Sequence, residues 1–148
     1  MIIRPLVAAD QAPLLRVWRR AVEATHAFLS PAEIDQIEPE VREYLASDMP
    51  LWTLEHAQKP VGFLGLVEDE IAALFIDPDL HGQGLGRQAI AFALQKGANR
   101  LKVNEGNPSA VGFYKHIGFT AIERQETDDA GRPYPLIVMQ WQGSAETA

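Results

Sequence analysis

Residues 71–87 constrain the fold of this 148-residue chain more than any other stretch. They begin with a continuous apolar run at positions 71–76, which is typical of a strand buried on both faces of a sheet. Pro78 then removes a backbone donor and ends the strand pairing. A glycine-rich segment follows and leads into apolar residues at helical spacing. The stretch therefore predicts a strand, a turn and an amphipathic helix over residues 84–96.

The glycines at the start of this helix indicate an anion site. Gly82, Gly84 and Gly86 carry no Cβ, so the free N–H groups of a helix N-terminus can close around a phosphate. The positive end of the helix dipole, roughly 0.5 elementary charge, favours the same ligand. We therefore expect a phosphorylated cofactor to bind here. The binding segment consists of His81, Gly82, Gln83, Gly84, Leu85, Gly86 and Arg87.

Other glycine motifs fit this segment poorly. It is not the Gly-x-x-x-x-Gly-Lys-Ser/Thr sequence of a P-loop. Its spacing, Gly82-x-Gly84-x-Gly86, also differs from the Gly-x-Gly-x-x-Gly of dinucleotide-binding folds, and it lies in mid-chain rather than after a first strand. On this segment alone, a glycine-rich turn without any ligand stays open as an alternative.

A second strand and helix follow at residues 100–117. Residues 100–103 form a short strand candidate, and Asn107 is a suitable N-cap with Pro108 at the first helical position. Gly118 fits the left-handed position that often follows a helix. The apolar stripe of the predicted helix consists of Ala110, Phe113, Tyr114 and Ile117.

The rest of the chain supplies two helices and two hairpins. Asp10 is expected to cap the first helix, and a capping box at residues 30–33 opens a second helix that runs to about Ser47. The predicted strands lie at 2–5, 51–55, 60–67, 71–76, 100–103, 120–125 and 135–142. The order βααβββαβαββ predicts an α/β sandwich with a mixed, largely antiparallel central sheet. No domain boundary is visible, so we expect one domain over residues 1–142 and a flexible tail over 143–148.

Composition excludes several classes of function. The chain has no cysteine, which excludes disulfides, cysteine nucleophiles and cysteine zinc sites. Its four histidines show no paired helical spacing, so we expect no metal site. A formal charge of −7 argues against a general nucleic-acid-binding surface. No apolar run approaches the roughly 20 residues that span a bilayer, and the N-terminus lacks a signal-peptide pattern, so we expect a cytoplasmic protein without membrane contact.

Two motifs together make the chain similar to a known family. A strand followed by Gln/Arg-x-x-Gly-x-Gly/Ala, and a later Asn-x-x-Ala-x-x-Phe-Tyr-x-x-x-Gly-Phe, resemble the GNAT family of acetyl-CoA-dependent N-acetyltransferases. In this chain they stand at residues 81–86 and 107–119, and His81 departs from the family's Gln or Arg. The likeness begins at Ile3-Arg4-Pro5, and Ala24-Thr25-His26 resembles a bacterial subgroup of the family.

The resemblance implies a GNAT fold, in which the strands at 71–76 and 100–103 splay apart around the cofactor. It also implies acetyl-CoA as cosubstrate. The implied contacts to its pantetheine arm are backbone groups of Leu74, Phe75 and Ile76 together with Asn104 and Asn107. A role as helix N-cap alone accounts equally well for Asn107.

For catalysis, the resemblance points to Tyr114 as the general acid. A phenol with a pKa of about 10 stays protonated at neutral pH and can give its proton to a departing thiolate. The alternative is a purely packing role beside Phe113. The general base stays open between Glu70, at the start of the cofactor strand, and His26, after the first helix. Each also has a plainer interpretation, Glu70 as a solvated turn residue and His26 as a capping or packing residue.

The sequence therefore predicts an N-acetyltransferase that moves an acetyl group from acetyl-CoA directly to a primary amine in a ternary complex. No cysteine or Ser-His-Asp arrangement offers a nucleophile for a covalent acyl-enzyme. The acceptor, a protein lysine or a small amine, depends on the loops at 23–32 and 126–135, which no motif interprets. The alternative function is a GNAT-fold acyl-CoA sensor or regulatory module without turnover.

Overall fold

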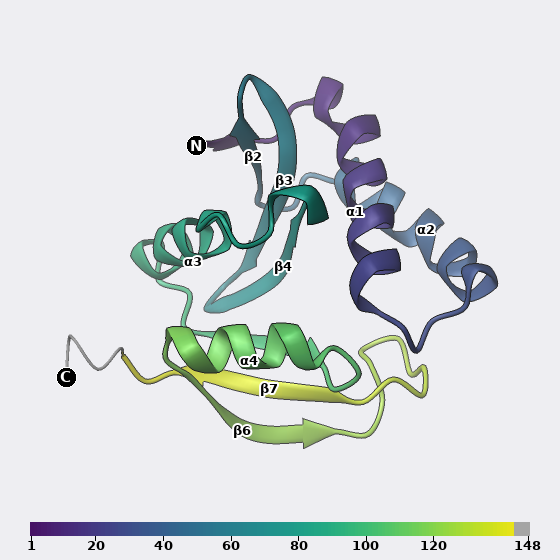
Figure 1. Cartoon of the computed structure of the whole chain (residues 1–148), viewed down its shortest axis with the longest axis vertical. Helices are drawn as coiled ribbons and strands as arrows, with labels where there is room; N and C mark the ends of the chain where they lie inside the picture. The colour runs from purple at the N-terminus through teal and green to yellow at the C-terminus, as the bar shows by residue number, and fades with distance from the viewer. Residues whose placement is uncertain (144–148) are drawn as a thin grey trace.

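A computed structural model describes residues 1–143, which form a seven-stranded sheet flanked by four α-helices (Figure 1). The strands are β1 (Ile2–Pro5), β2 (Leu51–His56), β3 (Lys59–Val67), β4 (Glu70–Ile76), β5 (Arg100–Asn104), β6 (Phe119–Gln125) and β7 (Leu136–Trp141). The helices are α1 (Gln11–Thr25), α2 (Pro31–Leu45), α3 (Leu85–Gln95) and α4 (Pro108–Ile117). Short 3-10 turns precede α1 at Ala8–Asp10 and α3 at Pro78–Leu80. The predicted α/β sandwich is confirmed, whereas the predicted tail lies, apart from Gly143, outside the described residues.

The sheet divides at its centre. Its strand order is β1-β2-β3-β4-β5-β7-β6, and β4 and β5 are its parallel pair. These two strands pair only where Glu70 meets Arg100 and Ile71 meets Leu101, and they separate beyond that point. β5 stays paired with β7 as far as Asn104. Within residues 1–143, the facing edges of β4 and β5 therefore lack a partner strand past Ile71, as the predicted splay requires.

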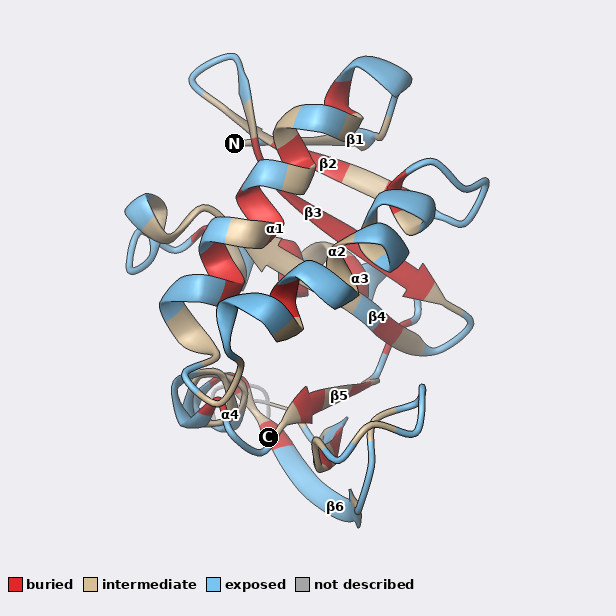
Figure 2. Cartoon of the chain, turned by 90° about the vertical axis from the view of Figure 1, so that its right-hand side faces the viewer, coloured by how far each residue is buried: buried red, intermediate tan, exposed pale blue. Residues whose placement is uncertain are grey.

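Apolar cores cover both faces of the sheet, and the helices turn their buried sides toward it (Figure 2). One core packs α3 and α4 against the sheet through Leu85, Ala89, Ile90, Ala93 and Ile117. The other packs α1 and α2 against it through Leu14, Trp18, Val22, Ile34 and Leu45. Side chains of β4 enter both cores, since Leu74 and Ile76 pack on the first and Ala73 and Phe75 on the second. Within residues 1–143, no helix is both long and apolar enough to cross a membrane.

The prediction that Asp10 caps the first helix is wrong. Asp10 has helical backbone angles, and its side chain makes no capping bond to α1. Its buried carboxylate instead accepts two hydrogen bonds from Arg4, one from the Val7 amide and one from the Thr53 hydroxyl. Burial favours the neutral acid, but these bonds outweigh it and hold the pKa of Asp10 below its ordinary value. The carboxylate thus ties the start of α1 to β1 and β2.

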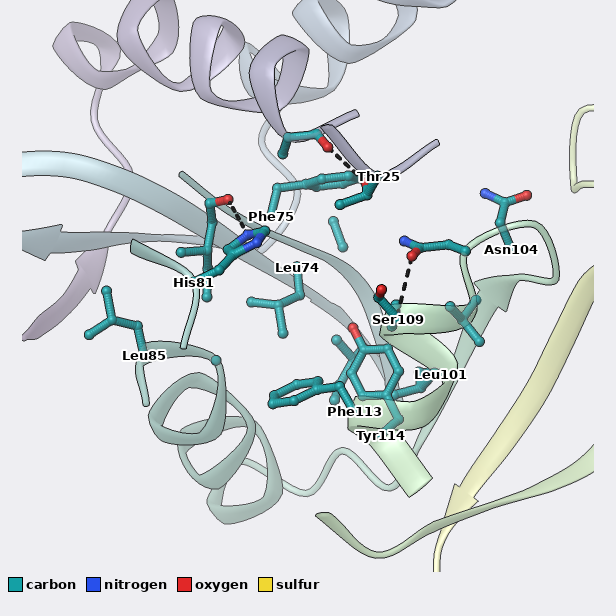
Figure 3. A pocket seen from close by; sticks show the side chains of 18 of the residues that line it. Thr25, Leu74, Phe75, His81, Leu85, Leu101, Asn104, Ser109, Phe113 and Tyr114 are labelled. Atoms are coloured by element: carbon teal, nitrogen blue, oxygen red, sulfur yellow. Dashed lines mark hydrogen bonds between the residues drawn. The ribbon is translucent and has the colours of Figure 1, made fainter. Parts of the chain in front are cut away.

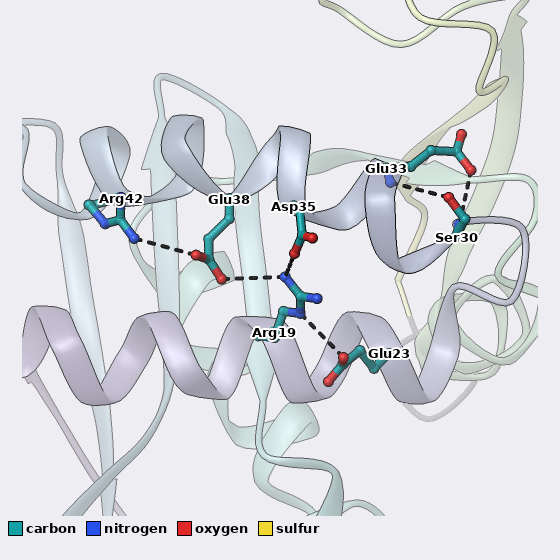
Figure 4. Close-up of polar contacts among 7 residues, drawn as sticks. All are labelled: Arg19, Glu23, Ser30, Glu33, Asp35, Glu38 and Arg42. Carbon is teal, nitrogen blue, oxygen red and sulfur yellow. Dashed lines mark hydrogen bonds and ion pairs between the residues drawn. The ribbon is translucent and has the colours of Figure 1, made fainter.

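The predicted capping box at the start of α2 is confirmed (Figure 4). The Glu33 amide donates to Ser30 Oγ at 3.2 Å, and the Ser30 amide donates to Glu33 Oε1 at 2.9 Å. Arg19 of α1 reaches across to Asp35 and Glu38 of α2 (Figure 4). Exposed ion pairs contribute about 0–1 kcal/mol each, so the apolar core provides most of the attachment of α2 to α1. The capping box therefore marks where the short connection ends and α2 begins.

Candidate active site

A pocket of about 610 Å³ lies where β4 and β5 separate (Figure 3). Its walls come from the end of α1, the two splayed strands, the start of α3 and α4 as far as Tyr114. The lining is mostly apolar, as is usual for small-molecule sites. Its polar side chains are Thr25, His26, His81, Arg87, Lys102, Asn104, Asn107, Ser109 and Tyr114.

The glycine-rich segment forms the part of this wall that leads into α3. Gly82 and Gly84 have φ angles of +82° and +83°, a left-handed conformation that residues with a Cβ rarely adopt. A Cβ at either position would meet no atom within 4 Å. Gly84 is the N-cap of α3, and the Gln88 amide donates to its carbonyl in the first helical hydrogen bond. The three amides after Gly84 therefore have no acceptor within the helix, which suits an anion.

Gly86 is required for a different reason from the other two glycines. It lies inside α3, where a Cβ would come within 2.9 Å of Phe113 Cζ and 3.6 Å of Ile76 Cδ1. A larger residue would push α3 away from α4 and β4. Gly86 therefore lets the helix pack closely beside the pocket, while Gly82 and Gly84 provide the turn.

His81 binds to the end of β4. Its Nε2 lies 3.1 Å from the backbone carbonyl of Ile76, and since a carbonyl only accepts, Nε2 must donate (Figure 3). The imidazole therefore reaches back across the 3-10 turn to the strand, and its ring is exposed. The side chain that departs from the family motif thus contacts one of the carbonyls assigned by resemblance to the cofactor arm.

Tyr114 presents its hydroxyl to the pocket (Figure 3). Its ring packs against Phe113 and Phe119, with centroid distances of 5.4 Å and 5.9 Å. Burial raises the pKa of Tyr114 to about 12, so the hydroxyl keeps its proton at neutral pH. In the described part of the chain, no side chain or backbone group hydrogen-bonds to this hydroxyl, and desolvation alone shifts its pKa. Tyr114 is therefore a protonated donor that is free to bond a ligand.

His26 borders the same pocket, just after the end of α1. Its ring packs against Phe28 at a centroid distance of 5.3 Å. Burial lowers the pKa of His26 below its ordinary value of 6.5, which keeps the imidazole neutral at pH 7. Nδ1 lies 2.8 Å from the hydroxyl oxygen of Thr25. The pocket thus contains a neutral imidazole and a protonated phenol, which are a possible base and a possible acid.

Two asparagines lie at the β5 end of the pocket. Asn107 accepts a hydrogen bond from the Ala110 amide at 3.3 Å, which confirms it as the N-cap of α4. It is only 7% exposed and lines the pocket as well, so the two roles are compatible. Asn104 Oδ1 is buried without a hydrogen-bond partner among residues 1–143, which leaves this oxygen available to a ligand.

Glu70 does not line the main pocket. It lies where β4 still pairs with β5, and it borders a second pocket of about 310 Å³. The other charged residues of that second pocket are Lys102, Asp128, Asp129 and Arg132. The structure therefore brings His26 and Tyr114 together in one pocket and leaves Glu70 in the next.

The main pocket contains most of the predicted cofactor residues. Those that line it are Leu74, Phe75, Ile76, His81, Gly82, Gly84, Leu85, Gly86, Arg87, Asn104 and Asn107, whereas Gln83 does not. The lining residues that the sequence did not predict include Thr25, Ser109 and Phe113. Helical spacing offered a signal for the last two, because positions 109 and 113 share a face with 110 and 114. No cluster of three or more His, Cys, Asp or Glu residues in the described chain could hold a metal ion.

Comparisons with known proteins agree with this geometry. Residues 19–141 match the family model of the acetyltransferase (GNAT) domain. The chain is 46% identical over 126 residues to the peptidyl-lysine N-acetyltransferase YjaB of Salmonella typhimurium. This alignment covers 84% of this chain and 86% of that protein. The solution structure of apo-form YjaB from Escherichia coli has a TM-score of 0.89 at 40% identity, covering 97% of this chain and all of that one.

A more distant likeness extends to a structure solved with coenzyme A. The crystal structure of the PaiA N-acetyltransferase from Thermoplasma acidophilum in complex with coenzyme A has a TM-score of 0.69 at 22% identity. The match covers 95% of this chain and 98% of that one. At this identity the likeness shows the shared fold alone. The match to the GNAT family model and the likeness to YjaB confirm the family resemblance that the two sequence motifs predict.

Proposed function

Because this chain belongs to the GNAT family of N-acetyltransferases and transfers an acetyl group to an amine, we propose that acetyl-CoA binds in the main pocket and that the acceptor is a protein lysine. One observation carries the proposal. A single pocket joins a helix start suited to an anion with the free, protonated hydroxyl of Tyr114. A phosphorylated thioester needs both groups, since its phosphates require an anion site and its departing sulfur requires a proton.

The residues of the pocket fit coenzyme A. The amides that follow Gly84 would hold the pyrophosphate, and Arg87 adds a positive charge close to them. The free edge of β4 at residues 74–76 would hydrogen-bond the pantetheine arm as an added strand, with Asn104 and Asn107 beside it. Bound in this way, acetyl-CoA supplies an activated acyl group. The PaiA N-acetyltransferase, which shares this fold, was solved in complex with coenzyme A, and this supports the assignment.

Tyr114 and His26 share the proton transfers in this proposal. His26, neutral and bordering the pocket, accepts a proton from the acceptor nitrogen. Tyr114 gives its proton to the sulfur as the carbon–sulfur bond breaks. Glu70 is the other predicted base, but we favour His26 because it shares a pocket with Tyr114 and Glu70 does not.

A lysine acceptor is supported by the name of the YjaB relatives, peptidyl-lysine N-acetyltransferase. In this chain, the loop before β7 is held against α2 close to His26. The Tyr134 hydroxyl donates to Glu33, and Arg132 pairs with Glu40 at 2.6 Å. Phe28, which contacts His26, also packs against Tyr134 at a centroid distance of 5.5 Å. The formal charge of −7 favours the approach of a cationic peptide.

An acceptor panel tests this proposal. Thiol release from acetyl-CoA would be measured with lysine-containing peptides, peptides with a free α-amine and blocked lysines, and small polyamines. We expect turnover with the lysine peptides, and mass spectrometry should find one acetyl group on the ε-nitrogen. Turnover confined to small amines would refute the lysine acceptor. Tight binding of acetyl-CoA with no thiol release across the panel would refute the catalytic use of this pocket.

A further inference from the structure

Thr25, in the last turn of α1, contacts two groups through one hydroxyl. Its Oγ1 lies 2.7 Å from the backbone carbonyl oxygen of Ala21, one helical turn earlier (Figure 3). The same oxygen lies 2.8 Å from Nδ1 of His26, the next residue in the chain. Both distances are those of good hydrogen bonds.

The hydroxyl has only one proton to share between these two contacts. The Ala21 carbonyl has none to give, so Thr25 must donate to it, because two bare oxygens at 2.7 Å would repel. The Thr25 oxygen can then only accept from Nδ1 of His26. Nδ1 must therefore carry a proton. In a neutral imidazole the other nitrogen, Nε2, is left with a lone pair and no proton.

We propose that Thr25 is a positioning residue, which fixes the tautomer of His26 so that Nε2 is always able to accept a proton from the acceptor amine. The inference rests on the role of His26 in the proposed function, and it adds the group that makes this role possible. With the proton on Nε2 instead, the neutral ring would offer the amine a donor and could not act as a base.

The proton balance of the transfer follows from this tautomer. As the acceptor nitrogen bonds to the acyl carbon, Nε2 of His26 takes one proton from that nitrogen and the imidazole becomes a cation. As the carbon–sulfur bond breaks, Tyr114 gives its proton to the sulfur. Exchange with solvent then removes the proton from Nε2 and returns one to Tyr114. The Nδ1 proton stays on its nitrogen throughout, because Thr25 accepts from it in both charge states of the ring.

Two substitutions at position 25 separate the hydroxyl from the shape of the side chain. Thr25→Val keeps the branched shape and removes the hydroxyl, whereas Thr25→Ser keeps the hydroxyl and removes a methyl group. Nitrogen-15 spectra of the His26 ring, recorded on the protein without ligand, report which nitrogen carries the proton. We expect Nδ1–H in the parent and in Thr25→Ser, and a shift toward Nε2–H in Thr25→Val. Nε2–H in the parent, or an unchanged tautomer in Thr25→Val, would overturn the proposal.

Steady-state kinetics provide the second measurement. Loss of one net hydrogen bond changes the tautomer ratio by roughly three- to tenfold. Because kcat follows the fraction of His26 that carries its proton on Nδ1, we expect kcat of Thr25→Val to fall, by at most that factor. Thr25→Ser should recover it, and coenzyme A affinity should be unchanged in both variants. A fall in kcat with Thr25→Val that Thr25→Ser does not rescue would contradict the positioning role.

The role of His26 itself is tested separately. His26→Gln should depress kcat more than Thr25→Val does, because it removes the base rather than changing the fraction that is correctly protonated. If His26→Gln left kcat unchanged, the assignment of His26 in the proposed function would fail, even with the tautomer confirmed by the spectra. The spectra need no turnover, so the two failures can be told apart.

Discussion

The side chain of Tyr114 has two properties that are seldom found together. Its ring is packed between aromatic neighbours, while its hydroxyl faces a pocket and has no hydrogen-bond partner in the described chain. Because the hydroxyl lines the pocket, it is available to a bound ligand. A ligand sulfur at this point would receive a hydrogen bond and, as it leaves, a proton.

Replacing Tyr114 with phenylalanine removes the hydroxyl and keeps the ring. General acid catalysis typically contributes about 10²–10⁴ in rate, so kcat of Tyr114→Phe should fall within that range while coenzyme A still binds. Since the pKa of Tyr114 is about 12, loss of its proton should not reduce the parent rate anywhere up to about pH 10. Thiol release across this pH range, with binding measured by calorimetry, checks both expectations.

Tyr44 provides the matched control for this experiment. It is also largely buried, its pKa is also raised by burial, and its hydroxyl also lacks a partner in the described chain. It packs with the core of α1 and α2, away from the pocket. Tyr44→Phe should therefore leave kcat unchanged. A Tyr114→Phe rate within about twofold of the parent would mean that the hydroxyl is not the acid.

Among the single elements, the start of α3 is the one on which the proposed binding of coenzyme A depends most. Gly82 and Gly84 fold the chain back so that the first amides of the helix point outward without acceptors. Gly86 allows the same helix to lie against Phe113, which neighbours Tyr114. The start of α3 therefore packs directly against α4, the helix that carries Tyr114.

Gly84→Asp and Gly84→Asn test the anion site with matched shapes. Either new residue must adopt a backbone φ angle near +83°, so both variants carry similar backbone strain. Only the aspartate places a negative charge where phosphates would lie. We expect Gly84→Asp to bind coenzyme A at least tenfold more weakly than Gly84→Asn, because like charges close together cost several kcal/mol near a protein surface. Equal affinities in the two folded variants, measured by calorimetry, would refute the phosphate assignment.

Apolar patterns predicted the strands of this fold to within one residue, and capping residues predicted the starts of α2 and α4, because these signals act between near neighbours. Asp10 was predicted wrongly because its partners, Arg4 and Thr53, approach through the sheet, and a charged partner binds its carboxylate better than a helix amide. Thr25 was missed as a site residue for a related reason. Its role depends on where one proton lies, and only the distances to Ala21 and His26 show that.

At the scale of the whole molecule, the sheet consists of two parts joined along a narrow line. β1 to β4 form one part and β5 to β7 the other, and the two residue pairs at Glu70 and Ile71 are their strand-to-strand connection (Figure 1). The pocket lies where this connection ends, with lining residues from both parts. A ligand that hydrogen-bonds the edge of β4 and contacts β5 would therefore continue the sheet across the gap.

In the proposed complex, coenzyme A occupies the gap between β4 and β5 with its phosphates on the start of α3. Amide hydrogen exchange, followed by NMR with and without coenzyme A, locates the bound ligand along the chain. At a ligand concentration 100 times Kd, amides that exchange only from the free protein should slow by about 100-fold. We predict this slowing at the gap-facing amides of residues 72–76 and at residues 85–87. Protection confined to the second pocket, around residues 128–132, or no local protection at all, would show that coenzyme A does not occupy this gap.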